Sequence, residues 1–394
     1  MHTKERNDKR FIMAKKANNK MMKRRRRRRV LFVFEILILL LLVGGIFVYA
    51  QVNNKLNKIQ TGDVDMGEVG VNEGVVDNEV LQGYQTIALV GLDASGVGSL
   101  EQGNSDTMII ASINNDTKKV KLVSIYRDTY LNIGDDNYKK ANAAYANGGP
   151  QQLMTMMNKN LDLNLTGYVT VDFTALVEAI DLLGGLDIEM TADEVEHMNN
   201  YCQETSKLTG KDYDPIEKVD GEHHLNGVQS VSYARIRYTA GNDFRRAARQ
   251  RLVIYKMVEK AKNSSWATLN KIVDTVCPMI SSSLSKQEIL KMGMAMIGYD
   301  IEDQVGFPFD HLEGETISNI IGDAMGKDEG YDCVLPVTLE TNVVKLHEFL
   351  YPEDAYTPSA TVTEYSDHII EISGYGEEDI PSSSEDGALP ADSY

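Results

Sequence analysis

The sequence has few cysteines and none of the common catalytic motifs. Its 394 residues include three cysteines, which are too few for a disulfide scaffold, and no Cys-x-x-Cys pair that would indicate a zinc site. It contains no Gly-x-Ser-x-Gly elbow and no His-Glu-x-x-His segment. Residues 91–96 have the outer spacing of a phosphate loop, but the Lys that should follow is missing. These absences argue against the familiar serine-hydrolase, zinc-protease and P-loop classes.

Basic residues are scarce outside the N-terminus. Residues 1–30 hold 14 of the 40 Lys and Arg but only two of the 58 Asp and Glu, so the rest of the chain holds 26 basic and 56 acidic residues. A protein body that binds nucleic acid shows a basic footprint of its own. We therefore expect no nucleic-acid partner for this acidic body.

One long apolar run follows the basic N-terminus. Residues 30–50 read VLFVFEILILLLLVGGIFVYA, with Glu35 as the single charge, and six consecutive arginines precede them. A helix of this length spans about 31 Å, close to the hydrocarbon thickness of a bilayer, and positive flanks stay in the cytoplasm. A cleaved signal peptide is disfavoured because the run is long and no Ala-x-Ala-like cleavage residues follow it. We expect a single-pass protein of the cell membrane, with a basic cytoplasmic tail (1–29), a transmembrane helix (30–50) and an extracytoplasmic remainder.

Beyond this run, the sequence predicts one globular domain between two polar segments. Residues 51–83 are typical of a tether, and the acidic residues 356–394 are expected to be disordered. Residues 84–355 alternate β-branched runs with helical patterns, which indicates an α/β fold. The expected strands are 86–92, 107–113, 120–125, 168–173 and 186–190, with a hairpin between the second and third. One expected helix begins at Pro150, and the others cover 175–183, 243–262 and 285–297. Residues 191–222 are expected to be a surface excursion.

Charged side chains gather at the ends of the expected strands. Asp93 follows the first strand, Asp106 precedes the second, and Arg127 follows the third. Open α/β sheets bind ligands beyond the carboxyl ends of their strands. Each of these residues taken singly is equally well explained as a turn residue, and the sequence leaves that alternative open.

Two further segments add arginines. Arg235 and Arg237 lie in YARIRY, and if this stretch is extended their side chains point the same way and converge on one anion. Arg246 and Gln250 are four residues apart in an expected helix and share a face. Arginines bind phosphate oxygens in a bidentate manner and aspartates hold Mg²⁺, so the set indicates a pyrophosphate–metal site. The alternative is a solvated helix face with Asp243 as its N-cap.

Together these segments resemble the LytR–CpsA–Psr family. The similarity runs in order from about residue 86 to 251, through ALVGLDAS, NSDTMIIASINNDTKKVKLVSIYRDTYL, KKANAAYANGG, YVTVDFTALVEAIDLLGGLDIEM, LNGVQSVSYARIRY and GNDFRRAARQR. The resemblance implies an α–β–α sandwich with a central mixed sheet. It implies a membrane-anchored phosphotransferase that moves a glycopolymer from a polyprenyl-pyrophosphate carrier onto peptidoglycan. The alternative is a membrane-tethered polyprenyl-pyrophosphate binder or regulator without transfer activity.

The resemblance also implies roles for individual residues. Asp93 and Asp106 would be the acids of a Mg²⁺ (or Mn²⁺) site, with Asp93 also a candidate general base. The residues implied for catalysis are Asp93, Arg127, Arg235 and Arg237. The residues implied for substrate binding are Lys140, Arg246 and Gln250. The sequence departs from the family pattern where Asn104 and Tyr126 replace a usual Arg and Pro.

Two further expectations concern the domain interior. A polyprenyl chain needs an elongated apolar pocket that opens at the arginines. Its candidate lining residues are Val171, Phe173, Leu176, Val177 and Ile180. In an oxidising compartment we also expect a Cys277–Cys333 disulfide, with Cys202 unpaired.

Overall fold

The structure is a computed structural model of the whole chain. It describes residues 60–61, 64–92, 100, 103–237, 242–285, 288, 292 and 298–380, which belong to one unit, Lys58–Tyr394. The expected cytoplasmic tail (1–29) and transmembrane helix (30–50) lie outside the described residues, as does Asp93. Within the described ranges, no helix combines the length and apolar character needed to cross a membrane.

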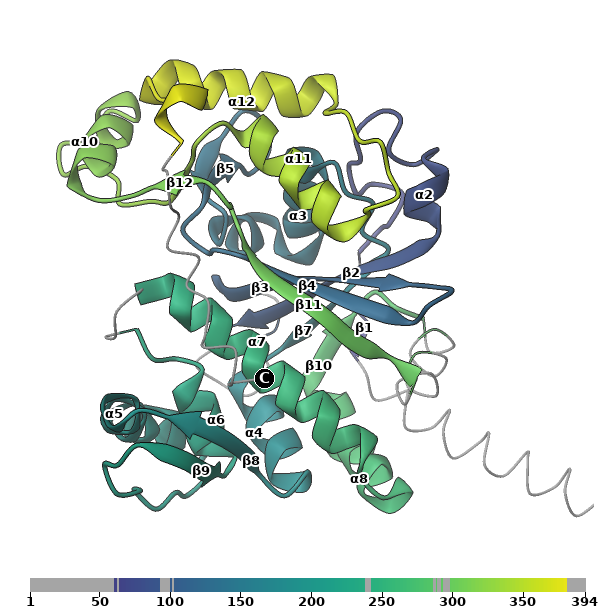
Figure 1. Cartoon of the computed structure of the whole chain (residues 1–394), viewed down its shortest axis with the longest axis vertical. Helices are drawn as coiled ribbons and strands as arrows, with labels where there is room; N and C mark the ends of the chain where they lie inside the picture. Colours follow the sequence, from purple (N-terminus) through teal and green to yellow (C-terminus); the bar gives the residue numbers. More distant parts are fainter. Residues whose placement is uncertain are drawn as a thin grey trace, which may run out of the picture. The chain divides into compact units, whose positions relative to one another are not determined.

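The described residues form a seven-stranded mixed sheet at the centre of the domain (Figure 1). Its strands, in spatial order, are β1 (Gln60–Thr61), β10 (Ile280–Ser282), β7 (Gly167–Val171), β2 (Tyr84–Leu92), β3 (Ser105–Asn114), β4 (Lys119–Ile125) and β11 (Asp300–Phe307). β2 pairs with β7, β4 with β11 and β1 with β10 in parallel, whereas the other neighbours are antiparallel. The predicted α/β class with a mixed sheet is confirmed.

The strands form where β-branched residues recur. Ile109, Ile110 and Val123 are fully buried between the layers, which is the environment that stabilises such runs. The predicted hairpin between β3 and β4 is confirmed: the Asn114 side chain accepts hydrogen bonds from the backbone N–H groups of Asp116 and Thr117 and so closes the turn.

Helices cover both faces of the sheet (Figure 1). Above it in that view lie α2 (Glu79–Gln82), α3 (Ala143–Leu161), α10 (Glu315–Ala324), α11 (Leu339–Leu350) and α12 (Ala360–Ser373). Below it lie α4 (Phe173–Leu182), α5 (Ala192–Thr209), α6 (Gly227–Tyr233), α7 (Asn242–Lys262) and α8 (Trp266–Val276). Short pieces complete the fold: β5 (Tyr130–Asn132), β6 (Tyr138–Lys140), β8 (Leu186–Met190), β9 (Gly221–Leu225), η1 (Cys277–Met279), β12 (His311–Leu312), β13 (Leu335–Pro336) and η3 (Glu377–Asp379). The layers are those of an α–β–α sandwich.

Most predicted elements in the middle of the chain are confirmed, with one difference. Residues 186–190 form β8, but this strand pairs with β9 in a separate two-stranded sheet. The helix expected to begin at Pro150 is confirmed as the second part of α3. It follows a short helical stretch from Ala143 and a kink at Gly148 and Gly149, where the φ of 62° at Gly149 suits glycine. Of the helix expected over 285–297, the described part shows the Ser285–Glu288 capping bonds.

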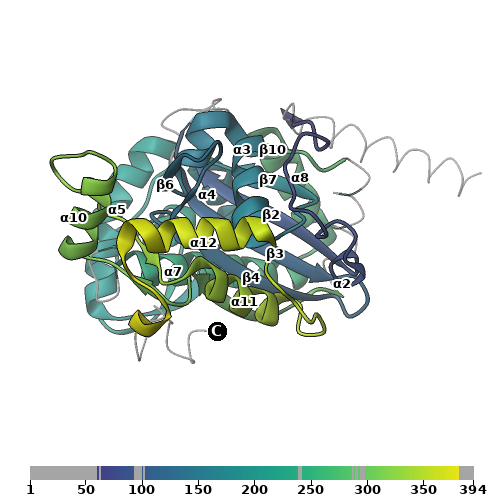
Figure 2. The ribbon, with the colours of Figure 1, turned by 90° about the horizontal axis from the view of Figure 1, so that it is seen from above.

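The polar segments on either side of the domain are more ordered than predicted. In the expected tether, Val69, Val75 and Leu81 are buried in the main core, and Asn72 donates a hydrogen bond to Asp162. In the expected disordered tail, α12 packs across the upper layer, as Figure 2 shows from above. Its buried residues, Val362, Ser366, Ile369 and Ser373, recur at helical spacing. Average composition hid this apolar face, so the prediction of disorder is wrong for 360–373.

The expected surface excursion, 191–222, is likewise mostly helical. Thr191 and Glu194 form a capping box at the start of α5, and Val195 and Met198 are buried against the lower core. Residues 191–222 therefore contribute to the core of the lower layer.

The expected Cys277–Cys333 disulfide is wrong. Cys333 is buried in the core above the sheet, and burial raises the pKa of its thiol to about 12. Cys277 begins η1, the short helical turn next to β10. Cys202 is buried in the lower core beside Met198. The two cysteines expected to pair thus belong to separate parts of the packing.

Candidate functional site

Asp106 lies at the centre of an arginine cluster at one edge of the sheet. It occupies the second position of β3, Arg127 follows the end of β4, Arg237 follows α6, and Arg246 lies in the first half of α7. Because β3 and β4 are antiparallel, the start of one strand and the end of the other meet at the same edge. Leu92, the last residue of β2, pairs with Ser105 at that edge too. The topology thus brings together segments far apart in the sequence.

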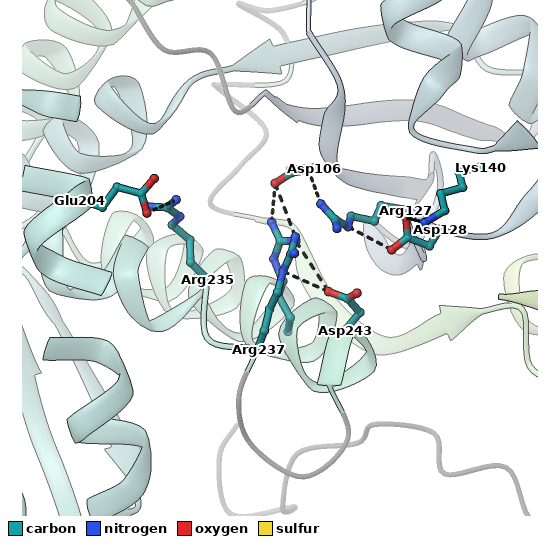
Figure 3. A network of polar contacts seen from close by, with 9 residues as sticks. Asp106, Arg127, Asp128, Lys140, Glu204, Arg235, Arg237 and Asp243 are labelled. Carbon is teal, nitrogen blue, oxygen red and sulfur yellow. Dashed lines mark hydrogen bonds and ion pairs between the residues drawn. The ribbon is translucent and has the colours of Figure 1, made fainter. Parts of the chain in front are cut away.

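Three guanidinium groups surround the Asp106 carboxylate (Figure 3). Arg127 Nη1 lies 2.8 Å from Oδ1, and Arg246 Nη2 lies 3.0 Å from Oδ2, while Arg237 Nη2 is 3.9 Å from Oδ2. Burial alone raises the pKa of Asp106, but the charges of Arg246 and Arg127 and their hydrogen bonds outweigh it and hold the pKa below its usual range. Asp106 is therefore an ionised carboxylate that fixes the positions of the arginines.

Two more carboxylates flank this centre. Asp128 Oδ2 lies 3.3 Å from Arg127 Nε, and its Oδ1 lies 3.2 Å from Lys140 Nζ. Asp243 Oδ1 lies 3.3 Å from Arg237 Nε and 3.8 Å from Arg246 Nη1. We call the seven residues the Asp106 cluster: Asp106, Arg127, Asp128, Lys140, Arg237, Asp243 and Arg246. It holds four cationic and three anionic side chains in an otherwise strongly acidic domain.

Arg235 does not converge with Arg237. The condition that the YARIRY stretch is extended does not hold, because α6 ends at Tyr233 and the chain continues in a turn. Arg235 instead points toward α5, where Nη2 lies 3.0 Å from Glu204 Oε2 and Nη1 donates to Thr205 Oγ1 (Figure 3). Its guanidinium also stacks over the ring of Phe173, 4.8 Å from the ring centroid. Arg235 and Arg237, two residues apart in one segment, therefore bind different partners.

Arg249 supports the site from beneath. It is fully buried and binds Glu194 of α5 through Nε and Nη2, at 3.1 and 2.8 Å. Its Nη1 donates to the carbonyl of Ile236, between the two arginines of the turn. Sequence analysis missed Glu194, Glu204 and Asp128 as partners. The Arg127-Asp128 pair was visible in the sequence, whereas nothing in the sequence distance between Glu194 and Arg249 signals their contact.

An apolar cavity of about 260 Å³ reaches Arg235 and Arg246. Arg235, Arg246 and Gln250 line one end, which confirms that Arg246 and Gln250 share a face. Most of the remaining wall is aliphatic and comes from β2, β3, β7, α4 and α7. The predicted lining residues Val171, Phe173 and Leu176 are confirmed. The prediction that Val177 and Ile180 line the cavity is wrong, since both point into the core between α4 and its neighbours.

The cluster suits a divalent cation only in company with a ligand. No group of three His, Cys, Asp or Glu side chains placed to hold a metal occurs among the described residues. Both oxygens of Asp106 already accept from arginines. Mg²⁺ in proteins is commonly bound by one or two carboxylates together with substrate phosphates and waters. The residues present fit such a shared site, and they do not form a complete metal cage of their own.

Comparison of the sequence with known proteins indicates one family. The sequence profile of the LytR_cpsA_psr family matches residues 46–316. The chain is 32% identical over 212 residues to the polyisoprenyl-teichoic acid–peptidoglycan teichoic acid transferase TagU of Enterococcus faecalis, covering 53% of this chain and 64% of that protein. It is 29% identical over 225 residues to the regulatory protein MsrR of Staphylococcus aureus, covering 56% and 62%. The chain thus spans less than two thirds of either relative.

Solved structures agree on the fold. The crystal structure of TagV from Bacillus subtilis superposes with a TM-score of 0.52 at 23% identity, covering 70% of this chain and 98% of that one. The shared fold supports the α/β architecture described above.

Proposed function

The chain belongs to the LytR–CpsA–Psr family, and we propose that it is a membrane-anchored phosphotransferase that moves a glycopolymer from a polyprenyl-pyrophosphate carrier onto peptidoglycan. One observation carries the proposal: Arg246, which binds Asp106, also lines an apolar cavity, so the Asp106 cluster and the cavity meet. A polyprenyl pyrophosphate has the same two parts, a strongly anionic head group and an apolar chain. The name of TagU, a polyisoprenyl-teichoic acid–peptidoglycan transferase, supports this substrate class.

The head group would bind to the cationic side of the cluster. Three guanidinium groups offer more N–H donors than the carboxylates around them can accept, and phosphate oxygens are matched partners for that planar geometry. Arg127 and Arg237 keep 22% and 34% of their side-chain surface exposed, so a ligand can reach them. Lys140, held beside Asp128, would add a further positive charge. Arg235 and Gln250 would contact the ligand where the head group meets the cavity.

The transfer step follows from these contacts. A sugar hydroxyl of peptidoglycan attacks the phosphorus that carries the glycan, and the bond from this phosphorus to the oxygen bridging to the lipid phosphate breaks. The products are polyprenyl phosphate and a glycan joined to peptidoglycan through a phosphodiester, and the hydroxyl proton passes to a base. Guanidinium groups stabilise the negative charge that develops on the phosphate oxygens, which is the main catalytic contribution in phosphoryl transfer.

Asp106 is poorly suited to take the proton, because its lowered pKa makes it a weak base. Asp93 remains the predicted base and lies outside the described residues. Asp106, together with the predicted Asp93, would hold Mg²⁺ (or Mn²⁺) through the bound phosphates. When bound, the ion would supply further charge neutralisation at the phosphate oxygens.

Release of the lipid product separates this proposal from its alternative. The purified full-length chain, given polyprenyl-pyrophosphate-linked glycan and wall material, should release polyprenyl phosphate and label the wall. The name of MsrR, a regulatory protein, keeps the binder or regulator as the second candidate. Binding of the lipid with no release on adding acceptor would favour that candidate.

The proposed location is the cell membrane, with the N-terminus in the cytoplasm and the domain outside. The motivation is the arginine run before the single apolar segment, residues 30–50. A reporter enzyme that works only outside the cytoplasm should be active when it is fused after Tyr394. Activity of a cytoplasm-dependent reporter at the same site would contradict this topology.

A further inference from the structure

Helix α8 presents an apolar surface to its surroundings. All eleven of its residues, Trp266–Val276, are described, and none is buried. Trp266 is 72% exposed and Val273, two turns on, is 36% exposed. Trp266 is the only tryptophan of the chain. Residues seven apart lie on the same side of a helix, so Trp266 and Val273 share one side of α8, which we call the α8 face.

Helix α8 follows α7 in the chain and packs against α4, and both of these helices line the cavity. The cavity wall follows α7 from Arg246 to Val258, about 18 Å at the rise of a helix. Its polar end therefore lies at the arginines, and its apolar end lies near Met257, one turn before α7 gives way to α8. Helix α4, which packs against α8, lines the same cavity with Phe173 and Leu176.

The path of the chain leads to the same side of the domain. The first described residues, Gln60–Thr61, form β1, which pairs with β10. β10 follows α8 directly, with only η1 between them. Nine residues separate β1 from the end of the expected membrane span at Ala50. Fully extended, that distance is at most about 35 Å, so the expected bilayer lies within reach of this edge.

The chemistry of the α8 face matches a lipid surface. Tryptophan is enriched at the boundary between head groups and acyl chains because it combines an apolar ring with one N–H donor.

We propose that the α8 face docks on the outer surface of the phospholipid bilayer and holds the apolar end of the cavity against it. A polyprenyl chain could then pass from the bilayer into the cavity without crossing water. This inference rests on the membrane anchorage of the proposed function, and it adds a surface that the transfer chemistry does not require.

The single tryptophan makes the test direct. The full-length chain is reconstituted in nanodiscs of phosphatidylglycerol and phosphatidylethanolamine, with and without bromine on the acyl chains. Bromine quenches tryptophan only at close range. We expect brominated lipid to reduce Trp266 emission, intact lipid to shift the emission to shorter wavelength, and acrylamide in the water to quench it weakly. As the matched control, Trp266→Phe with Val219→Trp moves the tryptophan to another exposed apolar position, before β9, where brominated lipid should have little effect.

Several results would overturn the inference. Full quenching of Trp266 by acrylamide with no response to bromine would place α8 in water. Equal bromine quenching at both positions would mean that no particular face docks. Protection of Trp266 in detergent that rises with protein concentration would assign the face to a second copy of the chain, and protection that requires added peptidoglycan would assign it to the wall.

The test also stays independent of the transfer reaction. Arg127→Ala should lower the transfer rate by a factor on the order of 10²–10³ and leave the quenching of Trp266 unchanged. Bromine quenching in a chain that shows no transfer would therefore uphold the docking while rejecting the proposed activity.

Discussion

Two sets of arginines near the site differ in what they bind. Arg127, Arg237 and Arg246 surround Asp106, and the first two keep part of their surface exposed. Arg235 and Arg249 are buried and bind glutamates of α5, namely Glu204 and Glu194. The residue type is the same and the two sets interleave in the sequence. The first set can exchange contacts with a ligand, whereas the second mainly holds α5, the turn after α6 and α7 together.

The largest expected effect on stability comes from the second set. Arg249→Ala would leave Glu194 buried without its partner and remove the donor to the Ile236 carbonyl. Breaking a buried ion pair in this way typically costs about 3–5 kcal/mol. The free energy of unfolding, measured by denaturant titration, should fall by that amount. Arg245→Ala on the same helix is the control and should change it by less than about 0.5 kcal/mol. Equal effects of the two variants would show that the Glu194 pair does not stabilise the domain.

The first set should dominate transfer. Arg127→Ala or Arg237→Ala should lower the rate of polyprenyl phosphate release by a factor on the order of 10²–10³, as loss of one transition-state donor typically does. Arg237→Lys should not restore the full rate, because an ammonium cannot reproduce the planar two-pronged contact. Thermal unfolding should confirm that Arg237→Ala remains folded. Transfer at the original rate in both alanine variants would mean that the site lies elsewhere.

Arg235 gives the most sensitive test of the difference between the two sets of arginines. The sequence assigns it to catalysis beside Arg237, but its guanidinium binds Thr205 and Glu204 and stacks on Phe173. Arg235→Ala should therefore destabilise the domain by about 1–3 kcal/mol, because it removes the buried hydrogen bond to Thr205 and the stacking on Phe173. Its effect on transfer should be smaller than that of Arg237→Ala. A larger loss of transfer with no change in the unfolding midpoint would restore the role that the sequence suggests.

The smallest expected effect is the pH dependence of the Asp106 contacts. Because the pKa of Asp106 is lowered in the folded state, its charge stabilises the fold at pH values above the ordinary carboxyl pKa, and this contribution is lost as the pH falls through the lowered value. The difference in unfolding free energy between the original chain and Asp106→Asn should be present at neutral pH and should shrink in acid. A difference that stays constant across the acid range would show that the charge of Asp106 contributes nothing.

The sequence predicted the central layers better than the periphery. Continuous β-branched runs such as 107–113 leave few alternatives to a buried strand, and the polar turn after them leaves few alternatives to a hairpin. Helix α12 was missed because its apolar residues are spaced along one face. The average composition of the segment is therefore polar. The tether was misjudged at Val69 and Val75, which are buried although they lie outside any helix or strand. Periodicity carries the information that composition averages away.

The meeting of several charged residues at Asp106 was predicted from the sequence, whereas the direction of Arg235 was not. Asp106 and Arg127 meet as the strand-end argument requires, since antiparallel pairing brings those ends together, and Arg246 of α7 joins them. The direction of Arg235 could not be read from the sequence, because it depends on where α6 ends and on the glutamates that α5 presents. Those glutamates come from a segment that the sequence assigned to a surface excursion. Long-range contacts of this kind have no local signal.

The central claim is that the Asp106 cluster binds the pyrophosphate of a lipid whose chain lies in the adjoining cavity. A crystal structure of the full-length chain with a polyprenyl pyrophosphate bound tests it most directly. The account predicts phosphate oxygens within hydrogen-bonding distance of Arg127, Arg237 and Arg246, and isoprene units along α7 from Gln250 toward Met257. A head group bound away from Asp106, or a lipid chain outside this cavity, would contradict the account.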